Sequence, residues 1–135
     1  MQGDKLNDEL TIRQWMTLLA IMHLSRDEAS YSKIADKMGC SKQNVKQIIV
    51  NLEKKKLVTL EQNENDKRAV NVRISNDCLK IMKAYYDNGN EFLKMIFNDF
   101  NEEELKTLWN LLKKLSSYDG KVWTGYEENV DISER

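Results

Sequence analysis

The chain has 135 residues and a formal net charge of −1 at pH 7, and 41% of its residues are hydrophobic. We expect one compact domain with at most a short appendage, because domains commonly contain about 100–200 residues. The sequence has neither the roughly 18 consecutive apolar residues of a membrane helix nor the basic start and apolar run of a signal peptide. These features predict a cytoplasmic protein without membrane contact.

The charges are distributed unevenly along the chain. Residues 31–75 contain ten Lys or Arg and five Asp or Glu, a net charge of +5. Residues 1–30 carry −2, and residues 76–135 carry −4. A basic segment between acidic flanks is suited to contact a polyanion locally. The alternative is an ordinary solvated, lysine-rich surface.

Apolar residues recur at helical spacing in three segments of the first half of the chain. Residues 12–24 predict a buried helix with Thr11 as its N-cap. Its predicted inward residues are Ile12, Trp15, Met16, Leu19, Met22 and Leu24. Ser30 is typical of the N-cap of a short helix, which we expect to end at Gly39. Ser41 is typical of the N-cap of a longer helix that continues to about residue 55. The predicted inward stripe of this third helix is Val45, Ile48, Ile49 and Leu52.

The second half begins with a change of period. Alternation of apolar and polar residues predicts strands at residues 58–61 and 70–74, joined by a polar turn with a basic tip. Helical spacing resumes after Ser75, with an apolar stripe that continues to Phe100. Asn101 and Glu104 have the spacing of a capping box for one more helix. Each of the last two helices has an apolar side that a small domain cannot cover alone.

This order predicts a mainly α fold with a small β-hairpin wing. We expect a winged helix-turn-helix core at residues 10–75, dimerisation helices at residues 76–118 and a tail at residues 119–135, after a short N-terminal segment of residues 1–9. Since an apolar stripe on each copy needs a partner, a homodimer is expected.

Residues 10–115 resemble a known family. LTIRQWMTLL resembles a helix of its core, YSKIADKMGCSKQNVKQIIVNLEKKKLV its helix-turn-helix, and NENDKRAVNVRIS its wing, with the D-x-R signature at Asp66 and Arg68. That family is the MarR-type transcriptional regulators. The resemblance implies a regulator, usually a repressor, that binds a palindromic operator as a homodimer and responds to a ligand. The alternative is a winged-helix protein-interaction module or antirepressor that does not bind DNA.

In such a protein, the helix at residues 42–55 enters the major groove. The candidate base-reading residues are Lys42, Gln43, Asn44, Lys46 and Gln47, whose side chains suit base edges and phosphates. The candidate wing residues for the minor groove are Asp66, Lys67 and Arg68, and the resemblance implies that the aspartate orients the arginine. The candidate phosphate contacts are Ser30, Ser32, Lys33, Ser41 and Arg73.

The resemblance also implies a pocket for a small aromatic or acidic effector, between the DNA-binding core and the dimerisation helices. The candidate lining residues are Trp15, Met16, Met82, Tyr85 and Tyr86. For these residues the alternative is an ordinary hydrophobic core, since aromatic and Met stripes at helical spacing are most often core.

The sequence departs from the family at several positions. Lys56 stands where a glycine is usual, so either a residue with a Cβ adopts a left-handed conformation or the connection is reshaped. Leu60 stands where arginine is frequent. Residues 1–9 are few for the family's first helix, so either the start is truncated or the dimer is built differently. We hypothesise that the tail, with Trp123 and Tyr126, packs where that helix would otherwise lie.

The remaining motifs predict no enzyme, cofactor or metal site. His23 is the single histidine, and the chain has neither a phosphate-binding glycine loop nor an HExxH motif. Cys40 and Cys78 each precede or begin a predicted helix, where a helix N-terminus lowers the pKa of an exposed thiol. Each is therefore either a small core residue or a reactive thiol.

Overall fold

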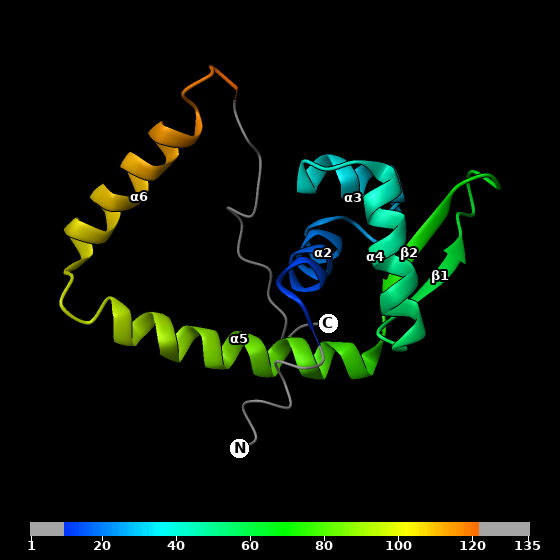
Figure 1. Ribbon diagram of the computed structural model, residues 1–135, viewed down its shortest axis with the longest axis horizontal. Coiled ribbons are helices and arrows are strands. Elements are labelled where there is room, and N and C mark those ends of the chain that lie inside the picture. The colour runs from blue at the N-terminus through cyan, green and yellow to red at the C-terminus, as the bar shows by residue number, and fades with distance from the viewer. Residues whose placement is uncertain (1–9, 122–135) are drawn as a thin grey trace. The chain divides into compact units, whose positions relative to one another are not determined.

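The computed structural model describes residues 10–121, so the hypotheses about residues 1–9 and about Trp123 and Tyr126 in the tail lie outside the described residues. The elements follow in the predicted order (Figure 1). They are α2 (Ile12–His23), α3 (Tyr31–Met38), α4 (Lys42–Lys54), β1 (Val58–Gln62), β2 (Val70–Ile74), α5 (Asn76–Ile96) and α6 (Glu102–Ser116). The predicted mainly α fold with a hairpin wing is thereby confirmed. The described residues fall into two compact units that meet within α5, residues 10–83 and residues 84–121.

Side-chain caps fix where the helices begin, at the residues that the sequence predicts. Thr11 forms a capping box with Gln14, and Asn101 forms one with Glu104, each closed by two hydrogen bonds of 2.9–3.1 Å. The N-cap hydroxyls of Ser30, Ser41 and Ser75 accept hydrogen bonds from the backbone N–H groups three residues later. Gly39, at φ 64°, ends α3 in the left-handed conformation.

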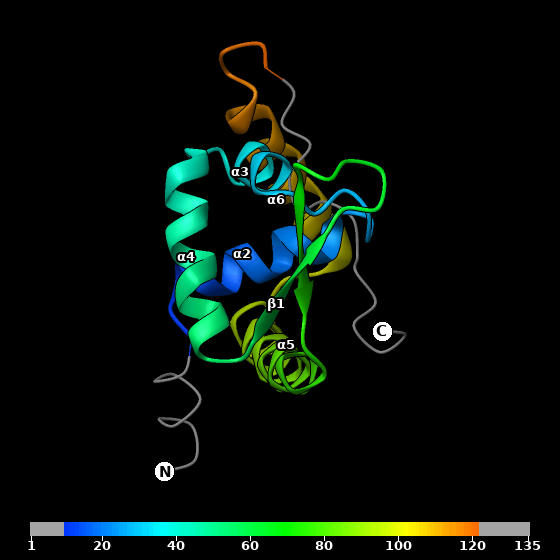
Figure 2. The same ribbon diagram turned by 90° about the vertical axis from the view of Figure 1, so that its right-hand side faces the viewer.

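The first unit packs α4 against α2, α3 and β1. Val45, Ile48, Ile49 and Leu52 of α4 are buried as predicted. Figure 2 shows α4 at the edge of this unit, with α2 beside it. Because these four residues occupy one side of the helix, the remaining positions of α4 face outward.

The prediction of which α2 residues face inward is largely wrong. Its buried residues are Gln14, Thr17, Leu18, Ala20, Ile21 and Met22, whereas Ile12 is 79% exposed and Met16 is 39% exposed. Two polar residues tolerate burial because they are hydrogen-bonded within the helix or its cap, and each also contacts a distant residue, Lys55 for Gln14 and Met38 for Thr17. Gln14 belongs to the capping box, and the Thr17 hydroxyl donates to the Arg13 carbonyl at 2.7 Å.

The hairpin is antiparallel, with Leu60 opposite Val72. A third segment joins it, since Ser30 forms an isolated bridge with Asn71. The N–H of Val72 donates to the Ala29 carbonyl at 2.9 Å. The wing is therefore attached through the backbone to the segment that precedes α3, which the sequence pattern does not predict.

The last two helices separate earlier than predicted. α5 ends at Ile96 and does not continue to Phe100, because residues 97–99 form a turn and Asn101 begins α6. The Phe97 and Phe100 rings pack edge to face across this turn, with centroids 5.5 Å apart. No helix within residues 10–121 is long and apolar enough to cross a membrane.

Of the two alternatives for Lys56, the structure has the left-handed conformation, with φ 59°, between α4 and β1. It is the single non-glycine residue with positive φ among residues 10–121. The connection between α4 and β1 thus has the left-handed backbone geometry that favours glycine, although Lys56 has a Cβ.

Replacing Lys56 by glycine should stabilise the fold by about 1 kcal/mol, because a left-handed conformation costs a residue with a Cβ roughly that much. The free energy of unfolding from urea titration measures this change. Lys54→Gly is the matched control, since it removes the same charge from the last residue of α4 and should destabilise by about 0.5–1 kcal/mol. If both substitutions changed the free energy of unfolding equally, the result would contradict backbone strain at Lys56.

Candidate nucleic-acid interface

The outward side of α4 carries the residues predicted to read bases. Lys42, Gln43, Lys46 and Gln47 are exposed, and Asn44 at the border is half-buried. Within residues 10–121, no hydrogen bond or ion pair occupies the four exposed side chains. Their amide and ammonium groups are therefore available to an external partner.

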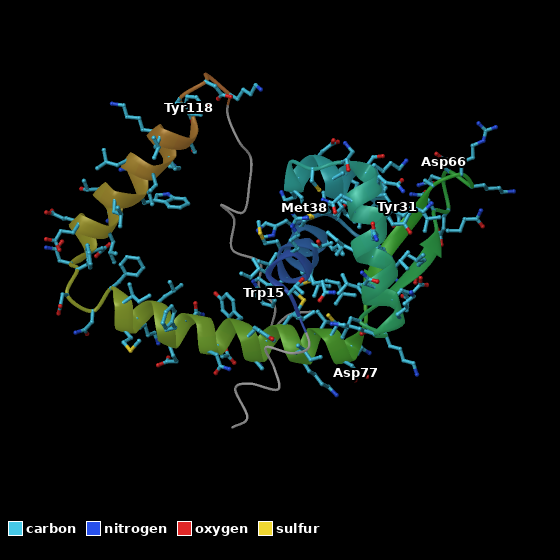
Figure 3. All side chains as sticks on the ribbon, viewed as in Figure 1. Trp15, Tyr31, Met38, Asp66, Asp77 and Tyr118 are labelled. Atoms are coloured by element: carbon cyan, nitrogen blue, oxygen red, sulfur yellow. The ribbon has the colours of Figure 1, made fainter. Side chains whose placement is uncertain are left out.

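The wing tip is ordered by hydrogen bonds from side chains to the backbone. Asn63 Oδ1 accepts the N–H groups of Asn65 at 2.8 Å and Asp66 at 3.1 Å. Gln62 Nε2 donates to the Lys67 carbonyl at 2.6 Å. Figure 3 shows Asp66 at the end of the hairpin. These contacts give a short polar loop a defined shape before it meets any partner.

Asp66 contacts Arg68 through the backbone. Asp66 Oδ1 accepts the Arg68 N–H at 2.9 Å, while within the described part of the chain no ion pair joins the carboxylate to the guanidinium. If Asp66 orients Arg68, it does so by fixing the backbone from which the exposed arginine side chain projects.

Arg73 is committed to contacts within the protein. Its Nε donates to Glu61 Oε2 at 2.7 Å, its Nη1 donates to the Arg26 carbonyl, and its Nη2 lies 3.8 Å from Asp27 Oδ1. The hydrogen bond from Arg73 holds the pKa of Glu61 below its ordinary value. A phosphate contact by Arg73 stays a prediction, and the geometry gives this side chain another role.

The other candidate phosphate contacts surround the start of α3 and α4. Ser32 and Lys33 are exposed in the first turn of α3. The Ser30 and Ser41 hydroxyls cap their helices as acceptors, which leaves each O–H free to donate.

Tyr31 lies beside these residues and is not singled out by the sequence pattern (Figure 3). Burial, with a smaller contribution from the Glu53 carboxylate, raises the pKa of Tyr31. The phenol therefore keeps its proton at neutral pH and can donate a hydrogen bond.

The predicted effector pocket is not assembled within one unit. Trp15, Met16 and Met82 belong to the first unit, whereas Tyr85 and Tyr86 belong to the second. The first unit contains a cavity of about 450 Å³, and none of these five residues lines it. Its walls come from the end of α2, the hairpin and the start of α5, and include Ile21, Met22, Arg26, Arg73, Ser75 and Leu79.

The two cysteines lie in different environments. Cys78 is fully buried, and burial raises its pKa to about 12. Cys40 is half-buried in the turn before α4. Residues 10–121 contain no group of three or more His, Cys, Asp or Glu side chains able to hold a metal ion.

A helix pair followed by a two-stranded hairpin defines a winged helix-turn-helix, and known proteins share both sequence and fold with this chain. A family model described as MarR family matches residues 9–69. An uncharacterized HTH-type transcriptional regulator, YfiV of Bacillus subtilis, is 33% identical over 85 residues, which cover 63% of this chain and 53% of that relative. The match thus spans about half of the relative's length.

Solved structures agree with this assignment. The MepR–DNA complex of S. aureus is 26% identical with a TM-score of 0.70, and the alignment covers 87% of this chain and 85% of that chain. A MarR/EmrR family transcriptional regulator from Acinetobacter sp. ADP1 is 25% identical with a TM-score of 0.68, over 82% and 77% of the two chains. The chain is therefore similar to members of the MarR family, over residues 9–69 by the family model and over most of its length by these structures. The relatives named here are described as transcriptional regulators.

Cys40 should react with iodoacetamide in the folded protein at pH 8 much faster than Cys78. With a pKa of about 12, roughly one Cys78 in ten thousand is a thiolate at this pH, and burial also blocks access. Peptide mapping by mass spectrometry measures both rates, and unfolding in urea should bring them close together. Similar rates in the native protein would contradict the buried position of Cys78.

Proposed function

We propose that this protein is a transcriptional regulator that binds double-stranded DNA in a sequence-specific manner, as a homodimer on a palindromic operator. The observation that carries the proposal is the side of α4 that faces outward, where Lys42, Gln43, Lys46 and Gln47 are exposed without partners among residues 10–121. Lys or Gln side chains at such a helix surface match the donors and acceptors of the major groove.

The wing supplies a second contact in this proposal. Arg68 projects from a tip whose backbone is held by Asn63 and Asp66. A guanidinium is attracted to the narrow minor groove of A·T-rich DNA, where the negative potential is strong. Major-groove reading by α4 and minor-groove contact by Arg68 together would position each copy on its half-site.

Dimerisation is supported by the apolar side of the second unit. α6 contains no buried residue, although it carries five leucines and a tryptophan. Its exposed large apolar residues are Leu105, Trp109, Leu111, Leu112 and Leu115. A monomer rarely leaves such a stripe in water, and a second copy covers it with the two-fold symmetry that a palindrome requires.

We also propose that the regulator is a repressor that a small aromatic or acidic ligand releases from DNA. The cavity of about 450 Å³ in the first unit is of a size that accepts small molecules. A ligand changes DNA affinity only if it binds the DNA-competent and DNA-incompetent states with different affinities.

A salt titration of binding to random A·T-rich duplex DNA tests the DNA contacts. The logarithm of the association constant should fall with the logarithm of salt concentration by about 0.9 per neutralised phosphate. Lys42→Ala/Lys46→Ala should weaken binding and flatten the slope by about 1 for each lysine that contacts a phosphate. Arg68→Ala should weaken binding as well.

Lys80→Ala/Lys83→Ala is the matched control, because it removes two exposed lysines from α5 instead of α4. It should leave the salt slope of the wild type unchanged. A folded wild type that does not bind DNA at low salt would contradict the proposal and favour the protein-interaction module.

Replacing Leu112 and Leu115 together by glutamate should convert the dimer into a monomer, because two charges cannot be buried unpaired in an apolar interface. Sedimentation equilibrium measures the mass. Thr107→Glu/Asn110→Glu places two glutamates at exposed polar positions of the same helix, with the same change of charge, and should keep the dimer. A wild type that is monomeric at micromolar concentration would overturn the role of α6.

A further inference from the structure

Arg73 attaches the hairpin to the loop between α2 and α3. Its guanidinium donates to Glu61 on β1 at 2.7 Å and to the Arg26 carbonyl, and lies 3.8 Å from the Asp27 carboxylate. The Arg73 side chain is 17% exposed. A planar guanidinium presents five donors in a rigid fork and so reaches acceptors on separate segments, whereas an ammonium presents three donors from a single nitrogen.

Two asparagine side chains reach the same loop. Asn71 Nδ2 on β2 and Asn63 Nδ2 at the start of the wing loop both donate to the Asp27 carbonyl, each at 3.2 Å. The backbone hydrogen bond from Val72 to Ala29 runs beside them. The loop is therefore held to both the middle of β2 and the base of the wing tip.

Asn63 connects this attachment to the wing tip. Its amide nitrogen donates to Asp27, while its Oδ1 accepts the N–H groups of Asn65 and Asp66. Asp66 Oδ1 in turn accepts the N–H of Arg68. A continuous chain of hydrogen bonds thus runs from the loop to the backbone of Arg68.

We propose that the side chains of Glu61, Asn63, Asn71 and Arg73, together with Asp27, form a wing anchor that fixes the wing relative to α3 and so sets where Arg68 meets DNA. Arg73 and Glu61 are positioning residues in this proposal, which rests on the DNA binding proposed above. A two-stranded hairpin is marginally stable by itself in water, so it needs such a support. A wing already in place also loses less conformational entropy on binding.

Glu61 and Glu64 offer a matched pair for testing the anchor. Both are exposed glutamates of the hairpin, three residues apart, but Glu61 contacts Arg73 whereas Glu64 has no ion pair within residues 10–121. By electrostatics alone, removing either carboxylate should raise DNA affinity, because each repels phosphates. The anchor predicts opposite signs for the two substitutions.

The experiment compares Glu61→Ala and Glu64→Ala in binding to A·T-rich duplex DNA at fixed low salt. Glu64→Ala should bind about two- to threefold more tightly than the wild type. Glu61→Ala should bind about tenfold more weakly, which is the size of one lost charge-assisted hydrogen bond. Thermal unfolding checks that both variants keep the fold.

Hydrogen exchange measures the anchor without DNA. The amides of Arg68 and Val72 should exchange about tenfold faster in Glu61→Ala, because local opening of the wing becomes easier. Glu64→Ala should leave both exchange rates at the wild-type level. These two amides report on the wing tip and on the attachment to Ala29.

Arg73→Lys separates anchoring from a direct phosphate contact. Lysine keeps the charge but lacks the guanidinium fork, so loss of the anchor should weaken DNA binding at an unchanged salt slope. A direct phosphate contact would leave affinity near the wild-type level, because an ammonium also binds phosphate. That second outcome would overturn the positioning role of Arg73.

The anchor would be overturned if Glu61→Ala bound DNA as tightly as the wild type or more tightly, and if the amides of Arg68 and Val72 exchanged at unchanged rates. A wild type that binds no DNA would instead remove the proposed function. In that case the exchange rates of the two glutamate variants still decide whether the anchor exists.

Discussion

Burial of one side of α4 is the constraint on which the candidate interface depends. Val45, Ile48, Ile49 and Leu52 fill the space between this helix and its neighbours, so the helix cannot rotate about its axis without exposing them. Its polar side is thereby held outward. The Ser41 cap adds a fixed starting point, since its hydroxyl accepts the N–H of Asn44. The position and orientation of the exposed side chains follow from this packing and this cap.

Features with a local cause could be predicted from the sequence, because the cause lies within a few residues. The caps at Ser30, Ser41 and Asn101 and the inward stripe of α4 are of this kind. The left-handed Lys56 is different, because only the resemblance to a family with glycine at this position pointed to it. The inward side of α2 could not be predicted from hydrophobicity, because Gln14 Oε1 accepts hydrogen bonds from the Thr11 N–H and from Lys55 Nζ, so this polar side chain can be buried.

Contacts between segments that are distant in the sequence could not be predicted from the sequence pattern either. The bridge between Ser30 and Asn71 joins residues 41 positions apart, and each side of it taken alone is an ordinary polar segment. The early end of α5 has a similar origin. The apolar period continues to Phe100, but the Phe97 and Phe100 rings pack on each other across a turn instead of continuing the helix.

The two wing arginines show why charge counted along a sequence overstates the charge available to DNA. Arg68 and Arg73 are five residues apart and contribute equally to the net charge of +5 in residues 31–75. Arg68 lies in the exposed tip, whereas Arg73 meets Glu61 and Asp27 within the protein. A guanidinium already paired with carboxylates gives up those contacts before it can bind a phosphate, so its net gain from DNA is small. The register of the hairpin places Arg73 opposite Thr59 and diagonal to Glu61. This register therefore decides that Arg73 forms contacts within the protein, whereas Arg68 stays exposed to a partner.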